Sequence, residues 1–90
     1  MLEGSAKVLN PLGLHARAAA QLVRVAGKYR SRITLSRDDL SASANAKSIL
    51  SVLALAAPIG TTLRVEAEGD DEHEAFDAIM SLFADGFGEI

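Results

Sequence analysis

The chain has 90 residues, of which 49% are hydrophobic and only 4% aromatic, and it contains no cysteine. This length predicts one domain, 1–90, with an aliphatic core, and the lack of cysteine excludes disulfides, thiol catalysis and cysteine-based metal sites. A formal net charge of −3 argues against generic nucleic-acid binding, and no apolar run forms a signal peptide or reaches membrane-spanning length. We therefore expect a cytoplasmic protein without membrane insertion or nucleic-acid partners.

Hydrophobic periodicity predicts four elements in the first half of the chain. Residues 5–9 alternate and predict a short strand, whereas apolar residues within 16–28 recur at i, i+3, i+4 and i+7, which is typical of a helix with one buried face. A second strand is expected over 32–36. After a polar turn, residues 40–44 predict a weak strand that returns beside it as a hairpin.

The second half of the chain predicts a helix, a strand and a final helix. Asn45 is a good N-cap for a short helix over 46–54, and residues 62–68 form the most regular strand pattern. Asp71 followed by Glu74 predicts a capping box at the start of the last helix. The order βαββαβα predicts an α/β (α+β) fold, with one four-stranded, mostly antiparallel sheet and three helices packed on one face.

The segment 10–18 delivers a histidine to the start of the first helix. Pro11 and Gly13 are helix breakers, whereas the helical residues that follow contain none, so His15 is expected at or beside the N-cap. The unpaired N–H groups and the dipole of that helix end favour an anion such as phosphate. Neutral imidazole is a nucleophile, and Arg17 offers a cationic group to the same phosphate oxygens. His15 is therefore the candidate catalytic residue and Arg17 the candidate phosphate ligand.

Each of these residues also has a structural interpretation. A histidine at a helix N-terminus is more often a cap than a catalyst, and Arg17 lies on the polar face of its helix in any case. Ser48 is expected in the first turn of the second helix, where capping alone explains a hydroxyl. His73 lies among acidic residues and is interpreted as a surface residue, so we predict neither a metal site nor a cofactor.

Three segments agree in order and spacing with one known family: Gly13-Leu14-His15-Ala16-Arg17, Lys47-Ser48-Ile49-Leu50 and Glu68-Gly69-Asp70-Asp71-Glu72. Over nearly its whole length the chain resembles HPr, the histidine-containing phosphocarrier of the bacterial phosphoenolpyruvate:sugar phosphotransferase system, or its nitrogen-branch paralogue. The resemblance implies an HPr-like open-faced β-sandwich in which His15 accepts phosphate on Nδ1 from phospho-Enzyme I. His15 then passes the phosphate to the soluble acceptor domain of a sugar permease, and Arg17 steadies the phosphoryl group.

The resemblance also implies a set of partners. Ser48 corresponds to a regulatory serine that a dedicated kinase, with its phosphorylase, modifies in some bacteria. The implied docking surface lies on the first two helices and comprises Arg17, Ala20, Arg24, Ile49, Leu50 and Leu53. The protein is expected to be a monomer, and a carrier with a transient phosphohistidine more than a stand-alone enzyme.

The chain departs from the family pattern at three places. Ala18 stands where proline usually follows the arginine, which is expected to preserve the helix but to loosen the junction before it. Ser51 replaces a glycine common in relatives, and the turn between the second and third strands is longer. These departures leave open an alternative, a regulatory binding module whose phosphorylation state controls partner proteins.

Overall fold

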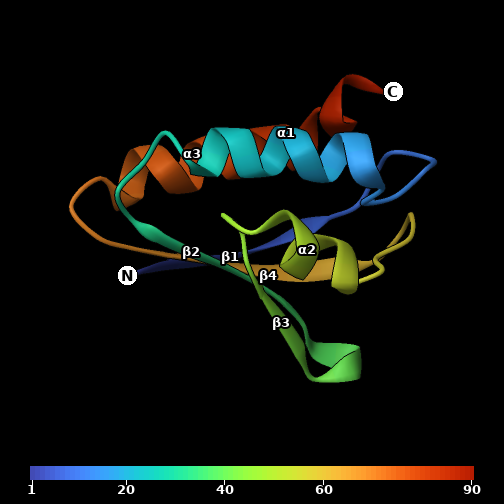
Figure 1. Ribbon diagram of the computed structural model, residues 1–90, viewed down its shortest axis with the longest axis horizontal. Helices are drawn as coiled ribbons and strands as arrows, with labels where there is room; N and C mark the ends of the chain where they lie inside the picture. The colour runs from blue at the N-terminus through green and yellow to red at the C-terminus, as the bar shows by residue number, and fades with distance from the viewer.

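Four strands and three α-helices make up most of the computed structural model, which describes residues 1–90 (Figure 1). The strands are β1 (Leu2–Lys7), β2 (Arg32–Arg37), β3 (Ala42–Asn45) and β4 (Thr62–Glu68). The helices are α1 (Ala16–Ala26), α2 (Ile49–Ala54) and α3 (Glu72–Ala84), with two short 3-10 turns, η1 (Asp38–Leu40) and η2 (Gly86–Gly88). No helix combines the length and apolar character needed to cross a membrane.

The four strands form one antiparallel sheet in the order β1-β4-β2-β3. In the middle of the sheet, Leu35 of β2 lies opposite Val65 of β4. All three helices lie on one face of the sheet and leave the other face uncovered (Figure 1). The predicted fold class, element order and one-sided packing are confirmed.

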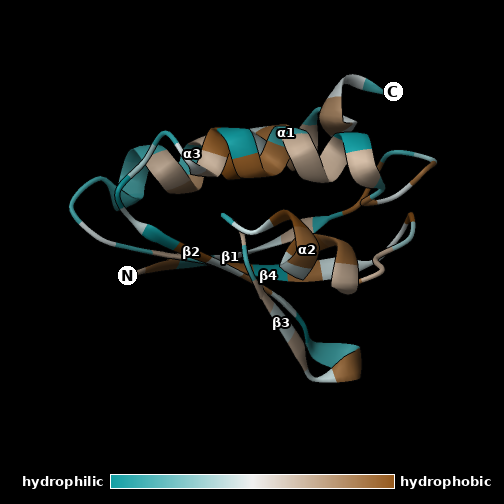
Figure 2. Cartoon of the chain, in the orientation of Figure 1, coloured by the Kyte–Doolittle hydropathy of each residue, from teal (hydrophilic) through white to brown (hydrophobic).

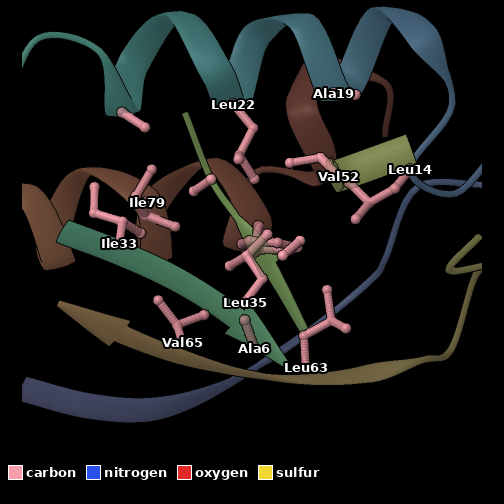
Figure 3. Close-up of a cluster of buried hydrophobic side chains, with 14 of the residues drawn as sticks. Ala6, Leu14, Ala19, Leu22, Ile33, Leu35, Val52, Leu63, Val65 and Ile79 are labelled. Carbon is pink, nitrogen blue, oxygen red and sulfur yellow. The ribbon is translucent and has the colours of Figure 1, made fainter. Parts of the chain in front are cut away.

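The core lies between the sheet and the helices, where the apolar face of the strands packs against the apolar faces of the helices (Figure 3). In β4, Leu63, Val65 and Ala67 are fully buried, while the residues between them are half-buried. Leu22 of α1 and Ile79 of α3 are also fully buried and reach down from the helices. Burial of each Leu- or Ile-sized side chain stabilises the fold by about 1.5–3 kcal/mol.

Helix α2 begins later than the sequence predicts, because the predicted cap residue has a different role. The side chain of Asn45 accepts a hydrogen bond from the N–H of Lys47 at 2.9 Å, and the N–H of Ala46 donates to the carbonyl of Ile33 at 2.9 Å. Both bonds hold the chain in turn and sheet-like geometry until Ser48, which becomes the N-cap. The predicted start at 46 and the placement of Ser48 in the first turn are therefore wrong.

The predicted capping box of the last helix is also wrong. Asp71 makes no side-chain cap bond in α3 but accepts hydrogen bonds from the N–H groups of Arg30 and Ser31, both at 2.9 Å, and from the Ser31 hydroxyl. These donors lower the pKa of Asp71 to about 2, with the Ser31 hydroxyl as the largest cause. The neighbouring Glu72, rather than Glu74, accepts from the N–H of Gly69 at 3.1 Å. Asp71 thus ties the start of α3 to the start of β2.

The remaining boundaries shift by a few residues. The first strand is β1 at Leu2–Lys7 rather than 5–9, and α1 ends at Ala26 rather than 28. The connection between β2 and β3 contains η1 and then Ser41 in the left-handed region, with φ of +51°. Because this connection extends to Ser41, β3 begins at Ala42 rather than at the predicted position 40.

Candidate functional site

The loop before α1 depends on a glycine. Gly13 has φ of +69°, and a Cβ added there would lie 2.6 Å from the carbonyl oxygen of Ala57. The N–H of Leu14 donates to that same oxygen at 2.9 Å, and the N–H of His15 donates to the carbonyl of Gly13 at 2.9 Å. Close packing of the loop against residues 57–58 therefore fixes the point at which the chain enters α1.

His15 is the N-cap of α1, as predicted, and both ring nitrogens have partners. Nδ1 accepts a hydrogen bond from the N–H of Arg17 at 3.3 Å, and Nε2 lies 2.6 Å from Oε2 of Glu89. An ionised carboxylate has only acceptors, so Nε2 must carry the proton of this pair. Nδ1 then holds a lone pair that points at the first turn of the helix. The side chain keeps 24% of its surface exposed, and the hydrogen bond from Arg17 to this lone pair is long, at 3.3 Å.

Glu89 is held against the ring by a buried amide. Nδ2 of Asn10 donates to Oε1 of Glu89 at 3.0 Å and to the carbonyl of Gly13 at 2.7 Å. The hydrogen bond from Asn10, followed by the one from His15, lowers the pKa of Glu89 below its usual range, and the charge of Arg17 contributes in the same direction. Glu89 is therefore a carboxylate at neutral pH.

The C-terminal segment reaches the site because an aromatic residue anchors it. Phe87 is buried, and its ring meets Phe83 edge to face with centroids 5.1 Å apart. Nε2 of Gln21 in α1 donates to the carbonyl of Phe87 at 3.2 Å. This segment lies beside the start of α1 (Figure 1). It delivers Glu89 to a residue 74 positions earlier in the chain.

Sequence reasoning missed both Asn10 and Glu89. Asn10 begins the segment 10–18 without a predicted role, and Glu89 lies beyond the last periodic element. One usable signal was present, since Gly86 and Gly88 flank an apolar Phe87, and a helix followed by such a tail is typical of a segment that turns back onto its own domain.

Arg17 follows His15 in the first turn of α1, and its guanidinium has no hydrogen-bond or ion-pair partner. The side chain is exposed, while its backbone N–H contacts the ring of His15. Ala18 is fully buried in α1, and the helix begins at Ala16 despite the missing proline. The expectation that the helix persists is confirmed, whereas the looser junction stays a prediction.

The other predicted residues line the exposed sides of two neighbouring helices. Ala20 and Arg24 of α1 are exposed, and α2 presents Ile49 and Leu50, which are 40% and 77% exposed. Leu53 is half-buried, and hydrophobic colour extends over much of α2 (Figure 2). An exposed apolar helix bordered by arginines has the composition of a protein-binding surface.

Ser48 lies at the edge of this surface and has a structural role of its own. Its hydroxyl accepts a hydrogen bond from the N–H of Ser51 at 3.4 Å, and the residue is half-buried. This bond is longer than the usual range of about 2.7–3.2 Å, so the contribution of the cap to stability is small.

No hollow for a small molecule is present at His15. The two depressions of the surface lie elsewhere, one near Arg32 and Glu66 on the uncovered face of the sheet and one near Asp38 and Thr62. Small-molecule sites are usually concave and largely enclosed. His15 therefore lies on an open part of the surface.

Comparison with known proteins agrees with this geometry. A family model described as "PTS HPr component phosphorylation site" matches residues 2–85. The phosphocarrier protein HPr of Cupriavidus necator is 46% identical over 89 residues, covering 99% of this chain and 98% of that protein. The phosphocarrier protein NPr of Proteus mirabilis is 40% identical over 82 residues, covering 91% and 90%. A crystal structure of HPr from Thermoanaerobacter tengcongensis superimposes with a TM-score of 0.93 at 40% identity, covering 100% of this chain and 99% of the other. The chain belongs to the HPr family of phosphocarrier proteins.

Proposed function

We propose that this protein is a cytoplasmic, monomeric phosphocarrier that accepts a phosphoryl group from phospho-Enzyme I on Nδ1 of His15. It then passes the group to the soluble acceptor domain of a sugar permease. The observation that supports this most directly is the state of the ring, in which Nε2 is held by Glu89 and Nδ1 keeps a lone pair at the start of α1.

Transfer onto His15 is an in-line displacement. The Nδ1 lone pair forms a bond to phosphorus while the bond between phosphorus and the donor breaks, and the donor keeps that electron pair. The phosphoryl oxygens arrive at the positive end of α1, where N–H groups of the first turn and the unpaired guanidinium of Arg17 can stabilise them. Because the ring stays at the surface, the same phosphate can leave to a second partner.

The surface formed by Arg17, Ala20, Arg24, Ile49, Leu50 and Leu53 is proposed to dock both partners. Partners with acidic rims and apolar centres fit this composition, and the arginines mainly raise the rate of encounter. Phosphorylation of Ser48 by a kinase, which is also part of the proposal, would add negative charge beside Ile49 and would repel the acidic rims of those partners.

The test is intact-mass analysis after incubation with phosphoenolpyruvate and Enzyme I, with His15→Ala as the control. We expect one acid-labile phosphate on the wild-type protein and none on the variant, provided that its circular dichroism shows the native fold. A wild-type protein that stays unmodified with both the sugar-type and the nitrogen-type Enzyme I would overturn the proposal.

A second candidate is a regulatory module that uses the same surface to control a partner protein, since the exposed Ile49 and Leu50 of α2 suit a controlled protein as well as a transfer partner. The two functions differ in whether phosphate is passed on from the protein to an acceptor domain. A carrier passes labelled phosphate on to an acceptor domain, whereas a regulatory module retains it and changes its affinity for the controlled protein.

A further inference from the structure

We propose that Glu89 is a positioning residue that keeps the proton of His15 on Nε2 both before and after phosphoryl transfer. This inference rests on the phosphocarrier function proposed above and adds to it a role for the C-terminal segment. Glu89 touches only the far side of the ring, so it acts through the histidine and not on the phosphate.

The bare protein needs such a device because neutral imidazole has two tautomers. With the proton on Nδ1, the acceptor nitrogen has no lone pair and cannot attack phosphorus. Two contacts favour the productive tautomer, namely the carboxylate of Glu89 at 2.6 Å from Nε2 and the N–H of Arg17 at 3.3 Å from Nδ1. The contact to Glu89 is the shorter and involves a full charge, so it is the stronger of the two.

The phosphorylated ring needs the same contact for a different reason. After Nδ1 bonds to phosphorus, the proton remains on Nε2 and the ring carries a positive charge, which the carboxylate of Glu89 balances. On delivery, the bond between Nδ1 and phosphorus breaks and its electron pair returns to Nδ1. The leaving group is then neutral imidazole with its proton on Nε2, rather than the much more basic imidazolate anion.

Glu89 can hold this position because its own surroundings are fixed. Asn10 is completely buried and donates to Oε1, which leaves Oε2 for the ring. The backbone two residues earlier is pinned by Phe87, whose carbonyl accepts from Gln21. The charge of Arg17 lies close enough to Glu89 to lower the pKa of Glu89, so removal of Glu89 leaves this cation without its nearby carboxylate.

The primary test is nitrogen NMR of the unphosphorylated protein, in which the two ring nitrogens of His15 report the tautomer directly. We expect the wild-type protein to show predominantly the Nε2–H form. In Glu89→Ala, the ratio of Nε2–H to Nδ1–H should fall about tenfold, because one charge-assisted hydrogen bond is lost. Glu89→Gln keeps an acceptor oxygen without the charge and should fall between the two.

The second readout is transfer in both directions. Glu89→Ala should accept phosphate from Enzyme I several-fold more slowly, and its phosphohistidine should also pass phosphate to an acceptor more slowly, because the Nε2 proton loses its charged partner. Asp85→Asn removes a negative charge from the same C-terminal region without contacting His15, so it should behave as the wild type.

The possible results separate this inference from the proposed function. If the wild-type protein accepts phosphate and Glu89→Ala matches it in tautomer ratio and transfer, only the role of Glu89 is overturned. If the wild-type protein accepts no phosphate, the proposed function fails and the transfer role of Glu89 fails with it, whatever the NMR shows. An altered tautomer ratio together with slower transfer, in a variant that melts like the wild type, supports the inference.

Discussion

Replacing Gly13 with alanine should unfold part of the loop that leads into α1 at His15. At φ of +69°, an L-residue costs about 1–2 kcal/mol relative to glycine. The new Cβ would also lie 2.6 Å from the Ala57 oxygen and 2.9 Å from Cα of Pro58, both of them backbone atoms that cannot rotate away. Such overpacking typically costs about 1–3 kcal/mol more.

The expected loss of unfolding free energy is therefore about 2–5 kcal/mol, which at about 4–8 °C per kcal/mol for a domain of this size lowers the melting temperature by about 8–40 °C. Gly60→Ala is the matched control, since Gly60 also has positive φ, at +91°, but its Cβ would meet nothing within 4 Å. That variant should lose only about 1–2 kcal/mol. Urea unfolding of both variants isolates the contact with residues 57–58. Equal losses would refute the idea that close packing, rather than φ alone, fixes the loop.

Three further changes test other contacts of the fold. Because Asp71 is a carboxylate with its pKa lowered to about 2 by the Ser31 hydroxyl and two N–H groups, it stabilises the fold above about pH 4, and this contribution is lost as the pH falls toward about 2. Asp71→Asn should remove that part of the acid dependence in thermal unfolding between about pH 5 and pH 2, and an unchanged profile would contradict the assignment. Arg37→Ala removes two 2.9 Å hydrogen bonds to carbonyls at the C-terminal end of α2 and should cost about 1–3 kcal/mol in urea unfolding, with faster amide exchange confined to α2. Ser48→Ala should lower the free energy of unfolding by about 0.5 kcal/mol, the low end for a lost N-cap, and Ser48→Gly should lower it still less. A large loss in either variant would mean that the cap is stronger than its 3.4 Å hydrogen bond indicates.

The boundaries that failed at α2 and α3 have different causes. Asn45 and Asp71 are both good N-caps by residue type. The Asn45 side chain accepts from the N–H of Lys47, two residues ahead, and Ser48 caps α2 instead, whereas Asp71 accepts from backbone groups far away in the sequence. For Asp71 those groups lie about forty positions earlier in the chain, at the start of β2. A cap preference of about 1 kcal/mol is easily outweighed when a tertiary contact supplies two or three donors at once.

The elements that depend on periodicity follow from the amino-acid sequence alone. Strand β4 was predicted to the residue, and the start of α1 with its N-cap His15 was placed correctly, because alternation and the i, i+3, i+4 pattern lie in neighbouring residues. The proximity of His15 and Arg17 was likewise local. The family pattern in the same segments pointed to phosphate transfer before any contact was known.

The groups that contact Nε2 of His15 and hold that contact in place depend on tertiary packing. The carboxylate of Glu89 and the buried amide of Asn10 come from opposite ends of the chain, and they meet only because Phe87 packs into the core formed by α1 and α3. No periodicity relates residues 10, 15 and 89. The tautomer of a catalytic histidine is set by whichever group contacts its other nitrogen, and that contact is a property of the folded chain.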